Sequence, residues 1–396
     1  MSVDLKSLAA GIAATEHQGR PQSKHGWRQV VQRRPAAYEQ VTKRQYSNLT
    51  PKQRRDYDQQ RLRWHVGLDC IETTRMSDAM DAMNQRLQTL NSGSTVARPG
   101  VMLSGDAGAG KSTIVIEYGR RVELSLREAM KMPLPTEGSP IPRLDTGGEY
   151  LPVCYFSITT QAVPTLQNAV RFYNPTLPTS KRLSQNALLS AFVENVERCQ
   201  TKLIILDQVQ SLKEANVGTR AVSDLLKDVM DACPTSLLIG AGIGLDQFRV
   251  FSDGLSARQS TLAQTGTRFS LHYVTPYDLN NADDKRDWAR LLTSIERNLH
   301  LYDTQEGDLR GLSQHLYDLT GGLTGELMPL LRNAANEAIH TGTERITRTV
   351  LNQVRRSAAR TIAEKGEDKI TDVKYRHPRT RPKGEKKSHL RKPVTA

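Results

Sequence analysis

The chain of 396 residues carries 55 Lys and Arg against 42 Asp and Glu, a formal net charge of +13, and its hydrophobic fraction is 37%. This length and composition allow two or three domains with buried cores, and they exclude a membrane-spanning protein, because no apolar run approaches the ~18 residues that cross a bilayer. Residues 1–19 are too polar for a secretory signal, and the four cysteines form no C-x-x-C pair, which argues against zinc or a disulfide framework. We therefore expect a protein of the reducing cytoplasm with no membrane partner.

The positive charge is concentrated at the two ends of the chain. Residues 1–65 contain 13 Lys and Arg against 5 Asp and Glu, and residues 369–396 contain 10 against 2, so the stretch between them is slightly acidic. Basic arms of this kind are typical of nucleic-acid contacts, because each Lys or Arg near a phosphate releases counterions. For the extreme C-terminus, a solvated disordered tail is an equal alternative.

The first elements along the chain precede any chemical motif. Residues 1 to about 45 are polar and basic without a clear period, and we interpret them as flexible or as folding on a partner. Thr50, Pro51 and Gln53 match a capping box with proline in the first turn, which predicts a helix to about Val66. A second helix is expected from Ser77 to Leu90, because apolar residues recur there at helical spacing. We interpret this stripe as core packing rather than a ligand site; it comprises Met76, Met80, Met83, Leu87 and Leu90.

The segment from Gly105 to Ser112 fits G-x-x-x-x-G-K-[ST], the loop that wraps nucleotide phosphates. Its glycines let backbone N–H groups approach the phosphate oxygens, Lys111 adds a charge on the β- and γ-phosphates, and the Ser112 hydroxyl is placed to hold Mg²⁺. An apolar strand at 101–104 precedes the loop, and a helix whose N-terminus faces the anion follows it. The motif predicts ATP and Mg²⁺ as ligands, with nucleotide bound by Gly105, Asp106, Ala107, Gly108, Ala109, Gly110, Lys111, Ser112 and Thr113.

Strands and helices then alternate up to about residue 275, which predicts an α/β core: a parallel five-stranded sheet covered by helices on both faces. Beyond Pro276 the strand patterns stop, and a small all-helical lid is expected. We divide the chain into a basic N-terminal extension (1–65), a P-loop ATPase core (66–275), the helical lid domain (276–363) and a basic disordered tail (364–396). The expected strands are 101–104, 151–158, 202–207, 236–241 and 268–274, and the expected helices are 111–130, 163–173, 185–199, 218–232, 283–298, 307–319, 324–340 and 346–363.

The second half of a nucleotide site is expected at Asp207, which ends the apolar run 203–206 as the acid of a buried parallel strand. We assign Asp207 to the metal side of the site. Gln208 follows, where P-loop ATPases of this architecture usually carry a glutamate that activates water. Because a glutamine amide is not a base at neutral pH, we expect slow hydrolysis. The glutamine is either natural or a replacement that traps the ATP state, and the intact surroundings favour replacement.

A P-loop core followed by a helical bundle is the outline of AAA+ ATPases, in which the nucleotide usually lies between subunits and meets a cation from the neighbour. Arg268, just before the last expected strand, is our candidate for that arginine finger, and Arg258 is a weaker rival. An arginine capping a strand is the plain structural alternative. The end of the fourth strand, Gly240-Ala241-Gly242, offers no polar sensor residue, and the turn 320–327 contains no Arg or Lys.

Together these pieces resemble the TniB/TnsC family of transposition ATPases, from about Tyr46 to Arg356. The resemblance implies a protein with no nuclease or strand-transfer activity of its own. With ATP it would assemble with itself as a ring or helical filament on double-stranded DNA, link a target-selection protein to the transposase, and act in the bacterial cytoplasm. The resemblance rests on segments 105–112, 206–212, 268–269, 321–327, 330–335, 338–342 and 345–347.

The residues that would touch DNA are less defined by the sequence. Lys181 and Arg182 precede an expected helix and are candidates, with a solvated loop as the alternative. A second reading of the whole chain is an AAA+ remodeller or clamp-loader-like ATPase that is not dedicated to transposition. The polar segment 157–161 lacks the aromatic residue that a protein-threading pore loop would need there, which counts against that reading. A third reading is a nucleotide switch that has no role on DNA.

Overall fold

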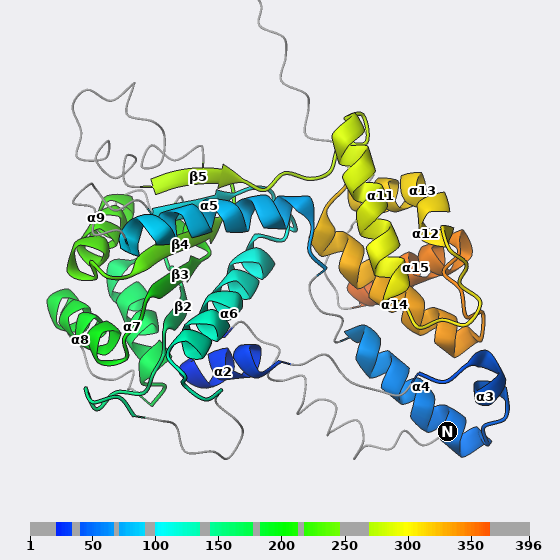
Figure 1. Ribbon diagram of the computed structural model, residues 1–396. Helices are drawn as coiled ribbons and strands as arrows, with labels where there is room; N and C mark the ends of the chain where they lie inside the picture. The colour runs from blue at the N-terminus through cyan, green and yellow to red at the C-terminus, as the bar shows by residue number, and fades with distance from the viewer. Residues whose placement is uncertain are drawn as a thin grey trace, which may run out of the picture.

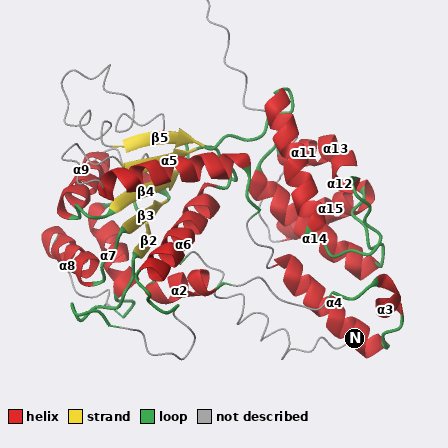
Figure 2. Ribbon diagram, viewed as in Figure 1, coloured by secondary structure: helices red, strands yellow, loops and turns green. Residues whose placement is uncertain are grey.

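The computed structural model describes residues 21–33, 40–66, 71–91, 100–134, 143–176, 183–212, 218–245 and 269–364. At its centre lies a five-stranded sheet of strand order β2-β3-β4-β1-β5, in which all neighbouring strands are parallel (Figures 1 and 2). The first four strands are buried throughout, as their unbroken apolar sequences require. The strands are β1 (Gly100–Ser104), β2 (Val153–Ser157), β3 (Leu203–Asp207), β4 (Leu237–Gly242) and β5 (Phe269–Tyr273).

Helices flank this sheet. Helix α6, which begins at the phosphate loop, packs on β2, β3 and β4, while α5 runs beside it over β1 and β4. A second group, α7, α8 and α9, packs together, and α7 lies on β2. The predicted α/β core is confirmed, and its elements begin and end within a few residues of the expected positions. The helices are α5 (Thr74–Asn91), α6 (Lys111–Ala129), α7 (Ala162–Tyr173), α8 (Gln185–Arg198) and α9 (Gly218–Ala232), with the 3₁₀ helix η1 (Val209–Leu212) after β3.

A helical unit with its own hydrophobic cluster follows the sheet (Figure 1). The expected helix at 307–319 is interrupted at Leu312, which divides it into two helices. From nearer the start of the chain, α4 packs on α14, and Leu62 and Trp64 of α4 join the cluster. The helices of this region are α3 (Lys43–Ser47), α4 (Pro51–Val66), α11 (Ala282–Arg297), α12 (Asp308–Gly311), α13 (Ser313–Thr320), α14 (Thr324–Thr341) and α15 (Arg348–Glu364).

The capping box predicted at the start of α4 is confirmed. The Thr50 N–H donates to Gln53 Oε1 at 3.0 Å, and the Gln53 N–H donates to Thr50 Oγ1 at 3.4 Å. The methionine stripe of α5 is core packing as expected, since Met76, Met80 and Met83 are all buried. None of the helices in the described part of the chain is long and apolar enough to span a membrane.

The interpretation of residues 1 to 45 as flexible is wrong for two described segments. Helix α2 (Lys24–Gln32) is capped by the Ser23 hydroxyl and inserts Trp27, fully buried, into the core of the sheet domain. Helix α3 is held by a capping box between Thr42 and Gln45. Both helices are too short for a periodic signal, and α2 is held by contacts with distant parts of the chain, which composition does not reveal.

Candidate nucleotide-binding site

The phosphate loop connects β1 to α6 in the conformation that its glycines allow. Gly108 and Gly110 have φ values of +77° and +93°, a region that other residues rarely adopt. Gly110 caps α6 without any side-chain hydrogen bond, so the first backbone N–H groups of the helix remain available to an anion. The local structure thus has the geometry that the sequence motif predicts.

Lys111 is the first residue of α6 and lies against the loop. Its Nζ donates to the carbonyl oxygens of Gly105 at 2.9 Å and Asp106 at 2.7 Å. Burial lowers the pKa of this ammonium, and the carboxylates of Asp106 and Asp207 partly oppose the effect. A poorly hydrated cation of this kind gains electrostatic energy when phosphate oxygens approach it.

Asp207, the last residue of β3, lies opposite the start of α6. The Ser112 hydroxyl donates to Asp207 Oδ1 at 3.1 Å, and the backbone N–H of Gln208 donates to the same oxygen at 2.8 Å. The Tyr155 hydroxyl donates to Asp207 Oδ2 at 2.6 Å. A serine hydroxyl and one carboxylate are hard oxygen donors of the type that Mg²⁺ takes together with nucleotide phosphates. Among the described residues no group of three or more His, Cys, Asp and Glu could hold a metal ion.

Gln208 has an unusual backbone for its residue type. Its φ is +61°, in the left-handed region that non-glycine residues seldom occupy, while its carbonyl oxygen accepts from the Ser211 N–H as η1 begins. Such strain costs roughly 1–3 kcal/mol and is found most often at functional sites. The position is therefore held by its surroundings, beside the Asp207 carboxylate.

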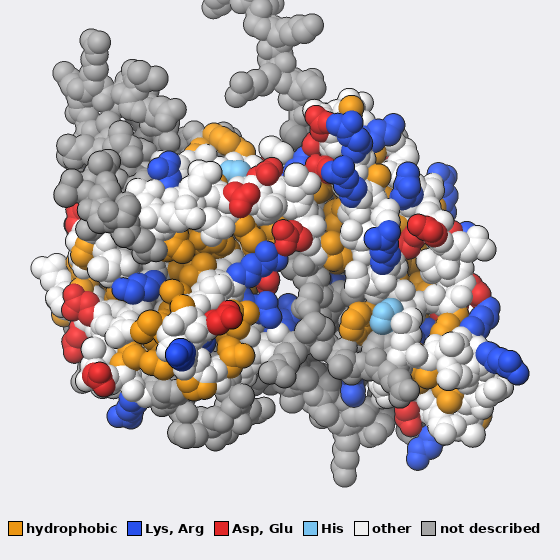
Figure 3. Space-filling view, in the orientation of Figure 1, with side chains coloured by type: hydrophobic (Ala, Val, Ile, Leu, Met, Phe, Trp, Pro, Cys, Tyr) orange, Lys and Arg blue, Asp and Glu red, His pale blue; other side chains and the backbone are white. Residues whose placement is uncertain are grey.

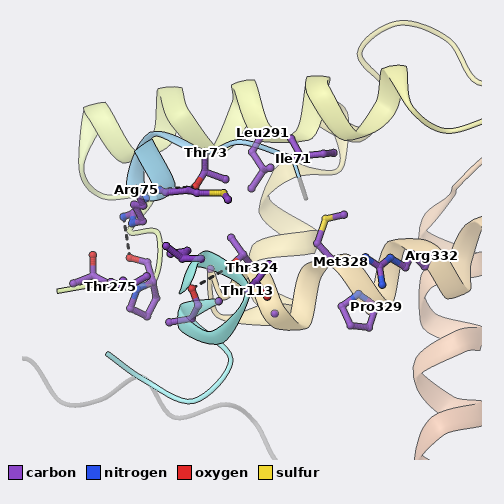
Figure 4. Close-up of a pocket in the computed structure, with 18 residues that line it drawn as sticks. Ile71, Thr73, Arg75, Thr113, Thr275, Leu291, Thr324, Met328, Pro329 and Arg332 are labelled. Carbon is purple, nitrogen blue, oxygen red and sulfur yellow. Dashed lines mark hydrogen bonds between the residues drawn. The ribbon is translucent and has the colours of Figure 1, made fainter. Parts of the chain in front are cut away.

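A cavity of about 220 Å³ adjoins the phosphate loop and is lined by residues of both the core and the helical unit (Figure 4). It is bounded by the segment that leads into α5, by the start of α6, by the link after β5 and by α14. Its lining residues are Ile71, Thr73, Arg75, Met76, Ala109, Gly110, Thr113, Ile114, Val274, Thr275, Pro276, Leu291, Gly322, Thr324, Gly325, Met328, Pro329 and Arg332.

The start of α14 contacts the phosphate loop directly. The Gly325 N–H donates to the Gly108 carbonyl at 2.8 Å, and the Thr324 hydroxyl donates to the Ala109 carbonyl at 3.3 Å. These two contacts join the turn at 320–327 to the phosphate loop. Arg332 also lines the cavity. Sequence reasoning did not select it, although it lies seven residues beyond Gly325 and so on the same face of the helix.

Arg75 is the second residue that sequence reasoning missed. It donates to the Pro276 carbonyl at 3.1 Å and to Asp284 Oδ2 at 2.9 Å, and its guanidinium lies 3.8 Å from the centre of the Tyr277 ring. It therefore joins α5 to the link between core and helical unit, at the wall of the cavity. No local sequence signal marks it, since the three partners are about 200 residues away.

Four residues named from the sequence lie outside the described residues. They are the finger candidates Arg268 and Arg258 and the DNA-contact candidates Lys181 and Arg182. The described chain resumes at Phe269, where β5 begins to pair with β1.

The sheet order, the phosphate loop after β1 and the acidic residue that ends β3 define a P-loop core of the AAA+ type, followed by a helical unit. No family model and no curated protein matches this sequence. Among solved structures, the chain is similar to the Orc1 protein of Aeropyrum pernix in complex with DNA, at 15% identity and a TM-score of 0.49 over 75% of this chain and 68% of that one. It is also similar to the Drosophila origin recognition complex bound to DNA (15% identity, TM-score 0.46, 86% and 73% covered) and to the RuvB branch-migration motor of Thermotoga maritima (11%, 0.39, 71% and 68%).

Proposed function

We propose that this chain binds ATP with Mg²⁺ between its core and its helical unit. The phosphates would lie in the loop formed by Gly105 to Thr113, and the base and ribose would enter the adjoining cavity. The 3.1 Å contact between Ser112 and Asp207 carries this proposal, because it joins the end of the loop to the carboxylate at the end of β3, which β4 separates from β1. Mg²⁺ would be held by these two side chains and by the nucleotide, and its charge would stabilise negative charge on the phosphates.

We further propose that Gln208 occupies the position of the residue that activates the attacking water. An amide can orient water but cannot accept its proton at neutral pH. Hydrolysis would therefore be slow and the ATP-bound state long-lived.

We propose that the ATP-bound chain assembles on double-stranded DNA as a ring or helical filament and regulates DNA transposition. In this role it would link a target-selection protein to the transposase. The resemblance to TniB/TnsC proteins and the basic ends of the chain support this proposal. On the described surface, Lys285, Arg286 and Arg290 of α11 are exposed, and Arg286 and Arg290 form ion pairs with Asp283 and Asp287. Figure 3 shows further Lys and Arg side chains on the helical unit.

DNA binding measured with ATP, with ADP and without nucleotide, over a series of salt concentrations, tests the role on DNA. We expect tight binding only with ATP and a steep loss of affinity with salt, as counterion release requires. Equal binding in all nucleotide states would contradict the proposal. ATP-dependent assembly without DNA affinity would instead favour an AAA+ remodeller or clamp-loader-like enzyme.

Whether an arginine of the neighbouring subunit completes the nucleotide site can be tested by mixing two variants. We propose Arg268 for this role, and Arg268→Ala and Lys111→Ala chains should each have little ATPase activity alone. In the mixture, one type of junction combines an intact loop with an intact finger, so partial recovery of turnover is expected. No recovery, with assembly intact, would exclude action across the interface.

Lys181 and Arg182 are proposed as DNA contacts because they are two adjacent basic residues that directly precede the α8 region of the sequence. In the double variant Lys181→Ala/Arg182→Ala, the slope of log affinity against log salt concentration should become shallower by the amount that two phosphate contacts contribute. Unchanged salt dependence would assign these residues to a solvated loop.

A further inference from the structure

We propose that Tyr155 is a positioning residue for the Mg²⁺ site, and that Trp27 of α2 holds it in place. The proposal rests on the proposed function, because it concerns the metal that Ser112 and Asp207 would bind with ATP. The proposal implies that the segment from Gln22 to Gln32 contributes to the geometry of the site, although it lies far from the phosphate loop in sequence.

The first step is the contact between Tyr155 and Asp207. The tyrosine hydroxyl, fully buried in the middle of β2, donates to Asp207 Oδ2 at 2.6 Å. The other carboxylate oxygen, Oδ1, faces Ser112 and accepts from the Gln208 N–H. Tyr155 thus fixes the rotation of the carboxylate and leaves Oδ1 directed toward the start of α6. Hydrogen bonds of this kind orient metal-binding carboxylates and tune their affinity.

The second step is the contact between Tyr155 and Trp27. Their rings are stacked, with centroids 6.3 Å apart and planes 14° from parallel. The Trp27 Nε1–H donates to Glu123 Oε2 at 2.6 Å, and Glu123 in turn accepts from Arg127 Nε at 2.7 Å. Burial raises the pKa of Glu123, while Arg127 and Trp27 oppose the effect. The indole is therefore fixed on its polar edge by α6 and on its face by β2.

The molecule has a specific space for this indole. A Cβ added to Gly119 of α6 would lie 2.8 Å from Trp27 and 2.6 Å from the side chain of Ile205, which is too close for either. Gly119 therefore lets the ring lie between α6 and the sheet. A helix interior normally favours alanine over glycine by about 1 kcal/mol, so glycine at this position is explained by the close approach of Trp27.

Further contacts hold α2 at the edge of the site. Gln22 Nε2 donates to Ser157 Oγ at 3.1 Å, and Ser157 is the residue paired with Asp207 in the register of β2 and β3. Lys24 and Arg28 both form ion pairs with Glu149, at 3.0 Å and 2.6 Å. The N-terminal segment thus contacts residues before and after Tyr155 in the chain. Its detachment would remove the indole that stacks on the tyrosine ring.

The test compares Tyr155→Phe with Tyr173→Phe. Tyr155→Phe keeps the ring and its stacking but removes the donor to Asp207. Tyr173→Phe removes another buried hydroxyl, which contacts Thr201 rather than Asp207 and serves as the matched control. The measurement is the binding of a slowly hydrolysed ATP analogue at increasing Mg²⁺ concentration, and separately without Mg²⁺.

For Tyr155→Phe we expect the Mg²⁺ concentration for half-maximal binding to rise by about tenfold or more, with metal-free binding unchanged. Tyr173→Phe should leave both unchanged. Equal Mg²⁺ dependence in the two variants would overturn the proposal. If the wild-type chain binds no analogue with Mg²⁺, the proposed function fails, which is a separate outcome.

The contribution of Trp27 can be observed by fluorescence in a chain that also carries Trp64→Phe and Trp288→Phe. Trp27 is then the single tryptophan, since the chain has three. We expect its emission to change when Mg²⁺ is added to the nucleotide complex, and this change to be lost in Tyr155→Phe. Gly119→Ala, which displaces the indole, should raise the Mg²⁺ requirement as Tyr155→Phe does. If the emission still changes in Tyr155→Phe, or if Gly119→Ala has a normal Mg²⁺ requirement, α2 does not influence Mg²⁺ binding through Tyr155.

Discussion

The backbone N–H of Gly325, in the first turn of α14, donates to the carbonyl oxygen of Gly108 in the phosphate loop at 2.8 Å. The approach is so close that a Cβ on Gly325 would lie 2.5 Å from that oxygen. The helical unit therefore rests on the loop itself, and the two parts close the cavity between them. Its occupant would contact both parts at once, so binding and the placement of α14 are coupled.

Gly325→Ala tests this coupling. The added methyl group must push α14 away from Gly108, at the 1–3 kcal/mol that overpacking typically costs, so ATP affinity should fall by about tenfold. Titration calorimetry with an ATP analogue measures it. Gly311→Ala is the control, because a Cβ there meets nothing within 4 Å, and it should bind normally. Unchanged affinity in Gly325→Ala would show that α14 is not needed for binding.

Gln208→Glu should increase ATP turnover. A well-placed general base contributes about 10²–10⁴-fold, and the glutamate would have nearly the shape of the glutamine that it replaces. Gln210→Glu is the matched control, since it makes the same chemical change two residues away, where the side-chain oxygen accepts from the Ile243 N–H. Single-turnover hydrolysis measures both. Equal rates in Gln208→Glu and the wild type would remove Gln208 from the position of the activating residue.

The core of this fold could be predicted because its signals are local. Each buried strand is a short apolar run, and the expected helix at 218–232 matches α9 residue for residue. The phosphate loop is a contiguous motif, so its residues could be named from the sequence alone. Asp207 could be named because it ends an apolar run that is typical of a buried parallel strand.

What could not be predicted depends on contacts between distant segments. Arg61 illustrates this: it was counted among the basic residues at the start of the chain, but it is fully buried and bonds Glu344, 283 residues away, at 2.7 Å. Trp27 likewise finds its partners in β2 and α6. Such pairs leave no periodic trace in the sequence, because one charged or aromatic residue is compatible with a surface or a core.

Arg61→Met should destabilise the protein strongly. The guanidinium is enclosed by Glu344, Asp58 and three tyrosine rings, and removing one partner of a buried ion pair typically costs about 3–5 kcal/mol because the other charge remains. Arg63→Met, two residues away on the exposed face of α4, should change stability by no more than about 0.5 kcal/mol. Urea denaturation compares the two. Similar midpoints would mean that the Arg61 pair adds nothing to stability.

The stability of the helical unit should fall as the solution becomes acidic, because His65 is held neutral. Burial, and secondarily the nearby Arg61, lowers the pKa of His65 from 6.5 to about 4, and its Nε2 accepts from the His300 N–H at 3.0 Å. The folded state thus stays unprotonated at pH values where the unfolded chain takes up a proton. The stabilisation is complete above the unfolded pKa and is lost as pH falls from 6.5 toward 4.

Between pH 7.5 and pH 5, this one histidine should lower the free energy of unfolding by about 2 kcal/mol. His65→Gln keeps an oxygen that can accept from His300 but does not titrate. Its unfolding free energy should depend less on pH and should be lower by about 1 kcal/mol at pH 7.5. His340→Gln changes an exposed histidine of α14 and should keep the wild-type dependence. Urea denaturation at both pH values measures all three chains. An undiminished pH dependence in His65→Gln would mean that His65 has the same pKa in the folded and the unfolded state.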